Sequence, residues 1–322
     1  MVTYINKVSK VSKVFIDKIS VTLKVPFEYR ENIPIHMDKM VDAGYAKKCY
    51  TGLYYNSIKV ASGSNDQDRI LVQCNPKSSG LSYFRIEFNP SKSFVSDAWA
   101  IVDSMIPDGH QLIVKKGVCT RLDLTVDINN EKISDFFFWY PKYKKTSIFF
   151  NASNIETYYL GVKSSPKEIC IYDKTTQVKK MNKALVVNED VPTKPITRVE
   201  VRIRSGSGPF LYEIIDTPNP FLKLGVSKYA NQKEGDWSFN LFLKTCNLCG
   251  AQEALISLPE YIRKKYKKLL SEKTPTWWDA EKIWSDWPCH VNELLATPSL
   301  HSLGMFSCKG IDESNKISSN FK

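Results

Sequence analysis

Apolar and polar residues alternate through much of the first two thirds of the chain, and this pattern predicts β-strands. Successive side chains of a strand point to opposite faces of a sheet, so a half-buried strand alternates with a period of two. Residues 15–25, Phe-Ile-Asp-Lys-Ile-Ser-Val-Thr-Leu-Lys-Val, follow this rule. Similar apolar and β-branched runs predict further strands at 70–74, 81–88, 118–128, 156–161, 168–172 and 197–204.

Apolar residues spaced three and four apart predict helices elsewhere. One covers 92–107, a second 133–140, and the spacing persists through 237–271, while 274–288 places four tryptophans in a short helix. Strands followed by helices favour an α+β fold over a doubly wound sheet. We expect a β-rich domain over 1–210, a helical C-terminal domain over 211–300 and a loose tail over 301–322, with no internal repeat.

Composition and charge narrow the class of protein. Apolar residues make up 43% of the 322 residues, which is enough for a buried core and excludes global disorder. The formal charge of +11 favours a polyanionic partner, because each phosphate neutralised by Lys or Arg releases condensed counterions. Basic residues that serve solubility alone are the alternative. There is no run of about 18 apolar residues, so we expect no transmembrane helix and no membrane partner.

Eight cysteines are scattered along a chain that is too long to need disulfides, which fits free thiols in a reducing cytoplasm. Cys246 and Cys249 form the one CxxC pair. A zinc site needs a second pair of ligands, and the candidates Cys289 and His290 stand alone. Because the pair shares a predicted helix face with Phe242, packing is favoured over a metal or redox site.

Three predicted strands each carry one polar face. These faces hold Arg121, Asp123, Thr125 and Asp127 in the first strand, Arg198, Glu200, Arg202 and Arg204 in the second, and Cys170, Tyr172 and Lys174 in the third. If the strands are neighbours, one face of the sheet collects acids, arginines, a tyrosine and a lysine. A solvated face on which acids and bases pair across strands is the plainer interpretation.

A tyrosine among acids and cations also suits attack on a phosphodiester. The phenol must lose a proton whose free pKa is about 10, a deficit of roughly 4 kcal/mol at pH 7. A divalent cation or a nearby lysine can supply stabilisation of that order. Asp and Glu are the hard ligands that such a cation prefers, and Arg or Lys can hold the phosphate oxygens. The set of residues is therefore the set that transesterification of DNA needs.

Several short motifs occur in a fixed order along the chain. They are 84–92 (Phe-Arg-Ile-Glu-Phe-Asn-Pro-Ser-Lys), 121–127 (Arg-Leu-Asp-Leu-Thr-Val-Asp), 157–161 (Thr-Tyr-Tyr-Leu-Gly), Ser165 with 171–174 (Ile-Tyr-Asp-Lys), 198–200 (Arg-Val-Glu) and 242–255. In this order they resemble the rolling-circle replication initiators of small bacterial plasmids and filamentous phages, of the type without a His-x-His metal motif. The resemblance covers roughly residues 80 to 290.

The resemblance implies a fold, an activity and partners. The fold would be a mostly antiparallel curved sheet with flanking helices. The activity would be an origin-specific DNA nickase and strand transferase that keeps the 5′ end as a phosphotyrosine and requires Mg²⁺ or Mn²⁺. The implied partners are double-stranded origin DNA, single-stranded DNA, and the host helicase and DNA polymerase in the bacterial cytoplasm. A homodimer is one option for the assembly.

Residue roles carry over from the same resemblance. Tyr172 would be the nucleophile, with Lys174 and Arg198 on phosphate or phenolate. Asp123 and Glu200 would be metal ligands or orienting groups, and Asp127 is a further candidate ligand. Tyr159, in the neighbouring motif, is the alternative nucleophile. We expect DNA contacts from a wider basic set: Arg121, Lys142, Lys144, Lys145, Lys163, Arg202 and Arg204.

The chain departs from the family pattern in two places. Gln177 stands where members often have an acid, three residues after the lysine of Tyr-Asp-Lys. Residues 161–163 are Gly-Val-Lys where Gly-Ser-Arg is usual, which keeps the positive charge. The four histidines lie far apart, so carboxylates must hold any metal.

Other interpretations stay open at this level. Asp123 and Glu200 can form a structural ion pair with Arg121, Arg198 or Arg202 in place of a metal site. A non-catalytic, sequence-specific DNA-binding protein of a mobile element explains the charge but leaves the clustered acids unexplained. The basic run 263–268 around Tyr266 can grip DNA or form a solvated helix face. The tryptophan block favours core packing over a platform for bases.

Overall fold

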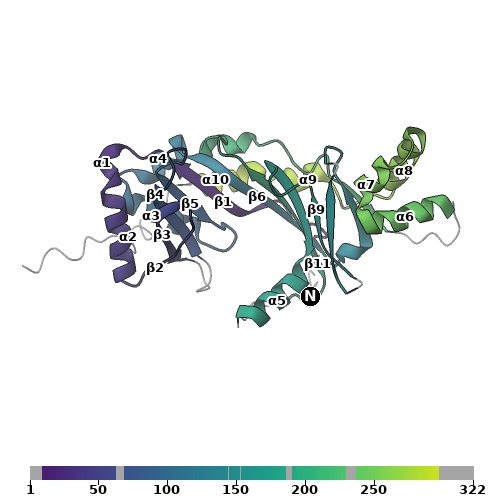
Figure 1. The fold of residues 1–322 in the computed structure, drawn as a ribbon, viewed down its shortest axis with the longest axis horizontal. Helices are drawn as coiled ribbons and strands as arrows, with labels where there is room; N and C mark the ends of the chain where they lie inside the picture. Colours follow the sequence, from purple (N-terminus) through teal and green to yellow (C-terminus); the bar gives the residue numbers. More distant parts are fainter. Residues whose placement is uncertain are drawn as a thin grey trace, which may run out of the picture. The chain divides into compact units, whose positions relative to one another are not determined.

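The computed structural model describes residues 9–62, 69–143, 145–152, 154–185, 191–229 and 237–296. Its main strands follow the order β2-β3-β4-β5-β1-β6-β11-β10-β9-β8, and β12 and β7 form a separate pair. Neighbouring strands run antiparallel. Helices flank the strands and dominate the last described part of the chain (Figure 1). The predicted α+β class, with an antiparallel sheet and a helical C-terminal region, is confirmed.

Two compact units divide these elements, and each is made of several chain segments. Unit 1 comprises residues 1–15, 123–204 and 217–288, and unit 2 comprises 16–122, 205–216 and 289–322. Strand β6 (Val118–Asn129) begins in unit 2 and continues in unit 1. Neither unit coincides with the predicted boundary at residue 210, and that domain division stays a prediction.

Unit 2 contains a five-strand half of the sheet and a layer of helices. Its strands are β1 (Phe15–Leu23), β2 (Ala46–Lys48), β3 (Tyr54–Ala61), β4 (Arg69–Pro76) and β5 (Phe84–Phe88). Its helices are α1 (Phe27–Arg30), α2 (Asn32–Asp42), α3 (Val95–Met105), α4 (Gly109–Lys116) and the 3-10 helix η2 (Leu211–Asp216). Cys74 lies against Met37 of α2, and Phe88 packs edge-on against Trp99 of α3 at 5.6 Å. One face of this half is therefore covered by helices.

Unit 1 contains the other half of the sheet. Besides β6 it has β8 (Thr146–Asn151), β9 (Asn154–Leu160), β10 (Lys167–Asp173) and β11 (Ile196–Arg204). Val199 and Val201 of β11 are fully buried on one face, because alternate positions of each strand face the core. Gly161 ends β9 with a φ of +94°, a conformation that favours glycine.

The remaining elements of unit 1 are mainly helical. They are η1 (Ile133–Asp135), β7 (Phe136–Trp139), α5 (Lys174–Leu185), β12 (Gly225–Lys228), α6 (Trp237–Cys249), α7 (Ala251–Ile256), α8 (Glu260–Glu272), α9 (Ala280–Trp284) and α10 (Trp287–Leu295), the last of which continues into unit 2. Helices α6, α7 and α8 lie together (Figure 1) and share a hydrophobic cluster with Phe137 and Trp139 of β7. Cys246 is fully buried in this cluster, so the CxxC pair belongs to a packed helix as expected. Trp278 and Trp287 are buried as well, which confirms the core interpretation of the tryptophan block.

Two local predictions are wrong. The segment 133–140 is a short 3-10 turn followed by β7, which pairs with β12, and not a helix. Residues 136–139 (Phe-Phe-Phe-Trp) are buried on both sides, and periodicity cannot separate such a run from a buried helix. Lys174, expected at the end of a strand, is the first residue of α5.

Some predictions fall beyond what the structure describes. Lys144 and the predicted tail 301–322 lie outside the described residues. None of the described helices has the length and hydrophobicity that crossing a bilayer requires.

Candidate active site

Strands β6, β11, β10 and β9 bring the predicted residues of unit 1 onto one polar face. The register places Tyr172 opposite Arg198 and Cys170 opposite Glu200 on β11, and the same two residues opposite Thr157 and Tyr159 on β9. Directly opposed residues of an antiparallel pair point to the same side. The tertiary structure therefore assembles the tyrosine, the acid and the arginines that the alternation had indicated.

Tyr172 donates a hydrogen bond from its hydroxyl to Oε1 of Glu200, at 2.5 Å. Tyr172 is 8% exposed and Glu200 is 4% exposed, so this pair is nearly closed to solvent. Hydrogen bonds from a hydroxyl to a carboxylate are short and strong. Glu200 is therefore placed to accept the phenol proton.

The second oxygen of Glu200 faces Arg202. Glu200 Oε2 accepts from Arg202 Nη2 at 2.6 Å and from Nε at 3.0 Å. Burial opposes the charge of Arg202, but Cys170, Glu200 and Asp123 hold its pKa above the ordinary value. Arg202 also lies 3.6 Å from Glu168, which Arg204 approaches at 3.3 Å. The face thus keeps a fixed cation beside the tyrosine–glutamate pair.

Arg198 is held by Asp127 on β6. Its Nε and Nη2 donate to the two carboxylate oxygens of Asp127 at 2.7 and 2.8 Å. The guanidinium also lies over the ring of Phe15, 5.2 Å from the centroid. A two-bond pair of this kind fixes the plane of the guanidinium beside Tyr172. Asp127 uses both oxygens on Arg198, which is a different role from the metal ligand expected of it.

The remaining acid of β6, Asp123, is 2% exposed and acts electrostatically on Arg202. Because Asp127 meets Arg198 and Asp123 meets Arg202, Thr125 lies beside Glu200, midway between them. The Thr125 hydroxyl is buried and has no hydrogen-bond partner among the described residues. Asp123, Glu200 and Thr125 offer oxygen donors of the kind that Mg²⁺ accepts, and Mg²⁺ often takes one or two carboxylates together with water and phosphate. Within the described residues, no group of three or more His, Cys, Asp and Glu could hold a metal ion.

Lys174 lies one residue beyond the strand. Its Nζ donates to Oε1 of Gln177 at 3.0 Å, one helical turn along α5. Asp173 accepts from the backbone N and the hydroxyl of Thr176 at 2.9 and 2.8 Å, and so caps the start of this helix. The position where family members often have an acid is therefore a direct neighbour of the lysine, and in this chain a neutral amide occupies it.

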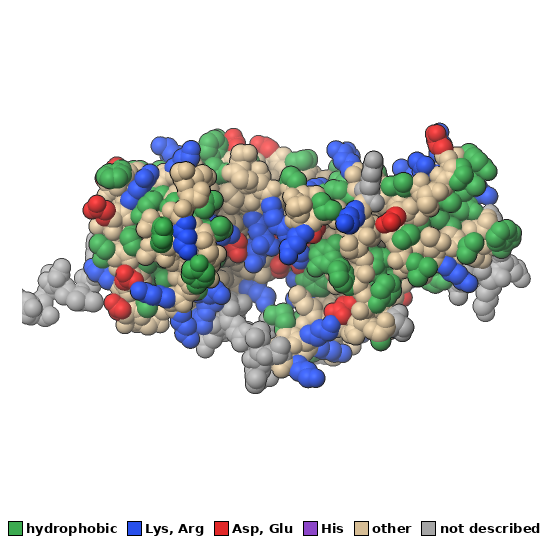
Figure 2. All heavy atoms as spheres, viewed as in Figure 1, with side chains coloured by type: hydrophobic (Ala, Val, Ile, Leu, Met, Phe, Trp, Pro, Cys, Tyr) green, Lys and Arg blue, Asp and Glu red, His purple; other side chains and the backbone are tan. Residues whose placement is uncertain are grey.

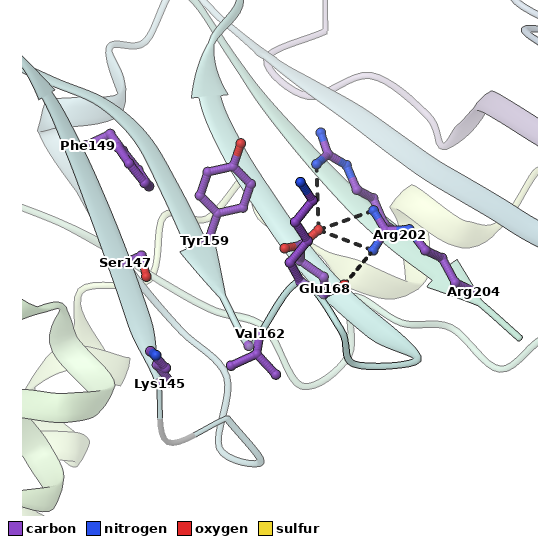
Figure 3. Close-up of a pocket in the computed structure, with 10 residues that line it drawn as sticks. Lys145, Ser147, Phe149, Tyr159, Val162, Glu168, Arg202 and Arg204 are labelled. Atoms are coloured by element: carbon purple, nitrogen blue, oxygen red, sulfur yellow. Dashed lines mark hydrogen bonds and ion pairs between the residues drawn. The ribbon is translucent and has the colours of Figure 1, made fainter. Parts of the chain in front are cut away.

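A pocket of about 470 Å³ opens beside this face (Figure 3). Its lining includes four of the basic residues predicted to contact DNA: Lys145, Lys163, Arg202 and Arg204. Phe149 and Tyr159 form one wall, with ring centroids 5.7 Å apart and planes at 85°. Phe149 is 56% exposed, so its ring is open to a ligand. The pocket combines cations for phosphate with aromatic surface for a base.

Two residues of this pocket escaped the sequence prediction. Glu168 is buried between Arg202 and Arg204 (Figure 3) and lies on the same face of β10 as Tyr172, four residues earlier. The alternation of that strand was the signal that could have found it. Phe149 had no such signal, because β8 was not predicted from the sequence.

Tyr159, the alternative nucleophile, lines the pocket and has no carboxylate as its closest partner. Burial raises the pKa of Tyr159, Cys170 adds to this shift, and Arg202 opposes it. Burial also raises the pKa of the adjacent Cys170 thiol to about 12. A phenol in this setting holds its proton, so the geometry favours Tyr172 over Tyr159.

The other predicted DNA contacts are dispersed. Lys142 is exposed in unit 1, and Arg121 lies in the part of β6 that belongs to unit 2. On α8 the basic side chains are exposed, but Tyr266 is buried in the hydrophobic cluster and not offered to a ligand. Figure 2 shows hydrophobic and basic side chains together over α6 and α8.

Sequence comparison links the chain to two proteins of known role. It is 26% identical over 206 residues to a replication initiation protein from Staphylococcus aureus, which covers 59% of this chain and 56% of the relative. It is 33% identical over 125 residues to a second replication initiation protein of S. aureus, which covers 37% of this chain and 35% of that relative. Both relatives are replication initiators. The chain thus spans about half or less of the length of the curated relatives it matches.

The other comparisons add less. A solved structure of a rolling-circle replication initiator from Geobacillus stearothermophilus matches 82% of this chain and 100% of its own, with a TM-score of 0.39 and 16% identity. No protein-family model matches the chain.

Proposed function

We propose that this chain is a rolling-circle replication initiator that nicks and rejoins one DNA strand through a covalent 5′-phosphotyrosine on Tyr172. The observation that carries the proposal is the 2.5 Å hydrogen bond from the Tyr172 hydroxyl to Glu200, flanked by Arg198 and Arg202. The identity shared with two replication initiation proteins supports the biological role. The replicon would be a plasmid or phage in a bacterial cytoplasm, and the host helicase and polymerase would act downstream of the nick.

The chemical step is a transesterification. The Tyr172 oxygen attacks phosphorus while its proton moves to Oε1 of Glu200, and the bond from phosphorus to the 3′ oxygen breaks. The departing 3′ oxygen takes a proton and becomes the primer end, while the 5′ phosphate stays on Tyr172. In the reverse direction a 3′ hydroxyl attacks the phosphotyrosine, and Glu200 returns the proton to the phenol.

Fixed cations stabilise the charge that develops on the phosphate. Arg198 lies opposite Tyr172 and is oriented by two bonds from Asp127. Arg202 lies on the other side of Glu200, and Lys174 follows Tyr172 by two residues. Groups already fixed in position need no reorganisation during the reaction, which is the main source of electrostatic catalysis.

A Mg²⁺ or Mn²⁺ ion would be held by Asp123 and Glu200, with the buried Thr125 hydroxyl beside them. Such an ion would neutralise charge on the non-bridging oxygens. We leave Asp127 out of this ligand set, because both of its oxygens bind Arg198. The proposed role of Asp127 is to position the arginine.

The DNA strand would cross the pocket next to this face. Lys145, Lys163 and Arg204 would bind its backbone, and an unpaired base would stack on Phe149 or Tyr159. Unpaired bases suit such a site because stacking on aromatic rings tolerates any sequence. The origin duplex would be opened before this contact forms.

The decisive experiment seeks the covalent intermediate. The protein is incubated with Mg²⁺ or Mn²⁺ and a labelled single-stranded oligonucleotide that carries a candidate origin, and the products are separated on a denaturing gel. We expect a protein–DNA adduct that Tyr172→Phe abolishes and Tyr159→Phe retains. An adduct that survives Tyr172→Phe but is lost in Tyr159→Phe would move the nucleophile to Tyr159.

The same assay separates enzyme from binding protein. A wild-type protein that binds the oligonucleotide but forms no adduct with either ion would overturn the proposal. That outcome would favour a non-catalytic, sequence-specific DNA-binding protein of a mobile element. In that case the pairs Asp127–Arg198 and Glu200–Arg202 would be purely structural.

A further inference from the structure

The two halves of the sheet repeat one strand order. In unit 2, counted outward from β1, the order is β1, β5, β4, β3, β2. In unit 1, counted outward from β6, it is β6, β11, β10, β9, β8. In both halves the first strand pairs with the fifth, and the others follow as a meander in reverse order. The sequence shows no internal repeat, so only the tertiary structure exposes this one.

The register of the strands extends the correspondence to single residues. Arg85 and Glu87 of β5 match Arg198 and Glu200 of β11, each pair separated by one apolar residue. Arg85 lies opposite Gln73 of β4, as Arg198 lies opposite Tyr172 of β10. Gln73 in turn lies opposite Ser57, as Tyr172 lies opposite Thr157. By register, Gln73 therefore occupies the position of the nucleophile.

Contacts within unit 2 repeat the form of the active site without its chemistry. Arg85 donates to Gln73 Oε1, Glu87 Oε2 and Ser20 Oγ, at 2.6, 2.6 and 2.8 Å. On β1, Ser20 pairs with Glu87 and Thr22 pairs with Arg85. Ser20 thus corresponds to Thr125, and Thr22 to the acid Asp127. An amide and a hydroxyl replace the tyrosine and an acid, so this copy cannot form a phosphotyrosine.

The polar face of this copy carries groups that suit a DNA strand. Lys47, Lys59 and Tyr55 are exposed. The register pairs Lys47 with Lys59, and Tyr55 alternates with Ser57 and Lys59 on β3, so they share the face of Gln73. The Lys77 ammonium lies 5.5 Å from the Tyr55 ring centroid. Cations interleaved with exposed aromatic rings are typical of surfaces that bind single-stranded DNA.

We propose that unit 2 is a second copy of the strand arrangement of unit 1 that has lost its nucleophile, and that the face formed by Lys47, Tyr55, Lys59 and Gln73 binds a DNA strand without cutting it. The choice of DNA as the ligand rests on the proposed function of unit 1. The charge and the tyrosine of this face support it independently. The repeat would then provide one strand-cutting face and one strand-holding face in a single chain.

The test compares two charge-matched double variants in a Tyr172→Phe background, in which the DNA stays intact. Lys47→Ala/Lys59→Ala removes two positive charges from the proposed face, and Lys115→Ala/Lys116→Ala removes two exposed charges from α4 of the same unit. Affinity for a labelled single-stranded oligonucleotide is measured by fluorescence anisotropy over a range of salt. The first variant should bind about tenfold more weakly and lower the log–log salt slope by about 2, while the second should match the parent.

A second measurement separates this proposal from that for unit 1. With Tyr172 intact, Lys47→Ala/Lys59→Ala should still form the covalent adduct with a short oligonucleotide that contains the cleaved strand at saturating concentration. Weaker binding by this variant alone supports the strand-holding face even if the wild type forms no adduct, an outcome that defeats only the proposed function. Equal affinities, or equal losses in both double variants, overturn the strand-holding face. Thermal unfolding of each variant confirms that it is folded.

Discussion

The carboxylate of Asp127 and the guanidinium of Arg198 form a two-bond pair that joins β6 to β11, with distances of 2.7 and 2.8 Å. The side chains are 18% and 10% exposed, so the pair is largely withdrawn from water. Removing one partner of such a pair leaves a poorly solvated charge, which costs more than the pair contributes when intact. The relationship makes Asp127 a positioning residue for the proposed catalytic arginine.

Asp127→Asn should lower the free energy of unfolding by about 2 kcal/mol, because Arg198 keeps its charge and loses its acid. Urea denaturation followed by circular dichroism measures this difference. The exposed pair Lys264–Glu260 on α8 provides the control, since Glu260→Gln should change stability by less than about 0.5 kcal/mol. A cost below the control value would mean that Arg198 finds another acid.

Glu200→Gln should slow adduct formation by about 100-fold or more, because the amide cannot accept the phenol proton. The variant should also recover more than the wild type when the pH is raised, since hydroxide then removes the proton in place of Glu200. Adduct rates across a pH series test both statements. An unchanged pH profile would assign Glu200 a role in orientation alone.

Phe149→Ala should weaken binding of single-stranded DNA by about 1 to 3 kcal/mol if a base stacks on its ring. The matched control is Phe150→Ala, because Phe150 is similarly exposed and does not line the pocket. Anisotropy with the same labelled oligonucleotide compares the two variants. Equal affinities would place the strand outside the pocket.

Lys167 links stability to alkaline pH. Burial lowers the pKa of Lys167 to about 8, and Lys142 and Lys223 add to the shift. The unfolded chain, with a pKa of about 10.4, holds this proton more tightly, so the lysine costs stability below about pH 8 and the cost disappears as the pH rises toward 10.4. Lys167→Met should therefore stabilise the fold by about 1 kcal/mol at neutral pH, after allowance for solvent screening, and by less at alkaline pH. Denaturation curves at two pH values measure the difference, and a gain that is equal at both would exclude the link.

Cysteine reactivity should follow burial. Burial raises the pKa of the Cys170 and Cys74 thiols to about 12, whereas Cys289 is exposed. Iodoacetamide should therefore label Cys289 in the folded protein and leave Cys170 and Cys74 unlabelled, because the thiolate is the reactive form. Mass spectrometry of the labelled peptides tests this order. Rapid labelling of Cys170 would mean that the polar face opens in solution.

Much of the proposed site was visible in the sequence because strands impose a period of two. Alternation in 121–128 and 198–204 placed Asp123, Asp127, Glu200 and the arginines on single faces, and the structure keeps these assignments. Lys174 was misplaced, because a strand pattern does not show where the next helix begins. The partners of each acid were also out of reach, since Asp127–Arg198 and Glu200–Tyr172 depend on which strands are neighbours.

By itself, then, the sequence determined the α+β class, the polar strand faces and the identity of the candidate tyrosine, because these follow from local periodicity and from short motifs. Only the tertiary structure decided that Glu200 meets Tyr172, that Asp127 binds an arginine, and that Gln73 holds the corresponding position in a second set of strands. Strand order and register are set by contacts between residues far apart in the chain. Two halves with the same strand order can thus differ at nearly every residue, and neither composition nor periodicity shows that they correspond.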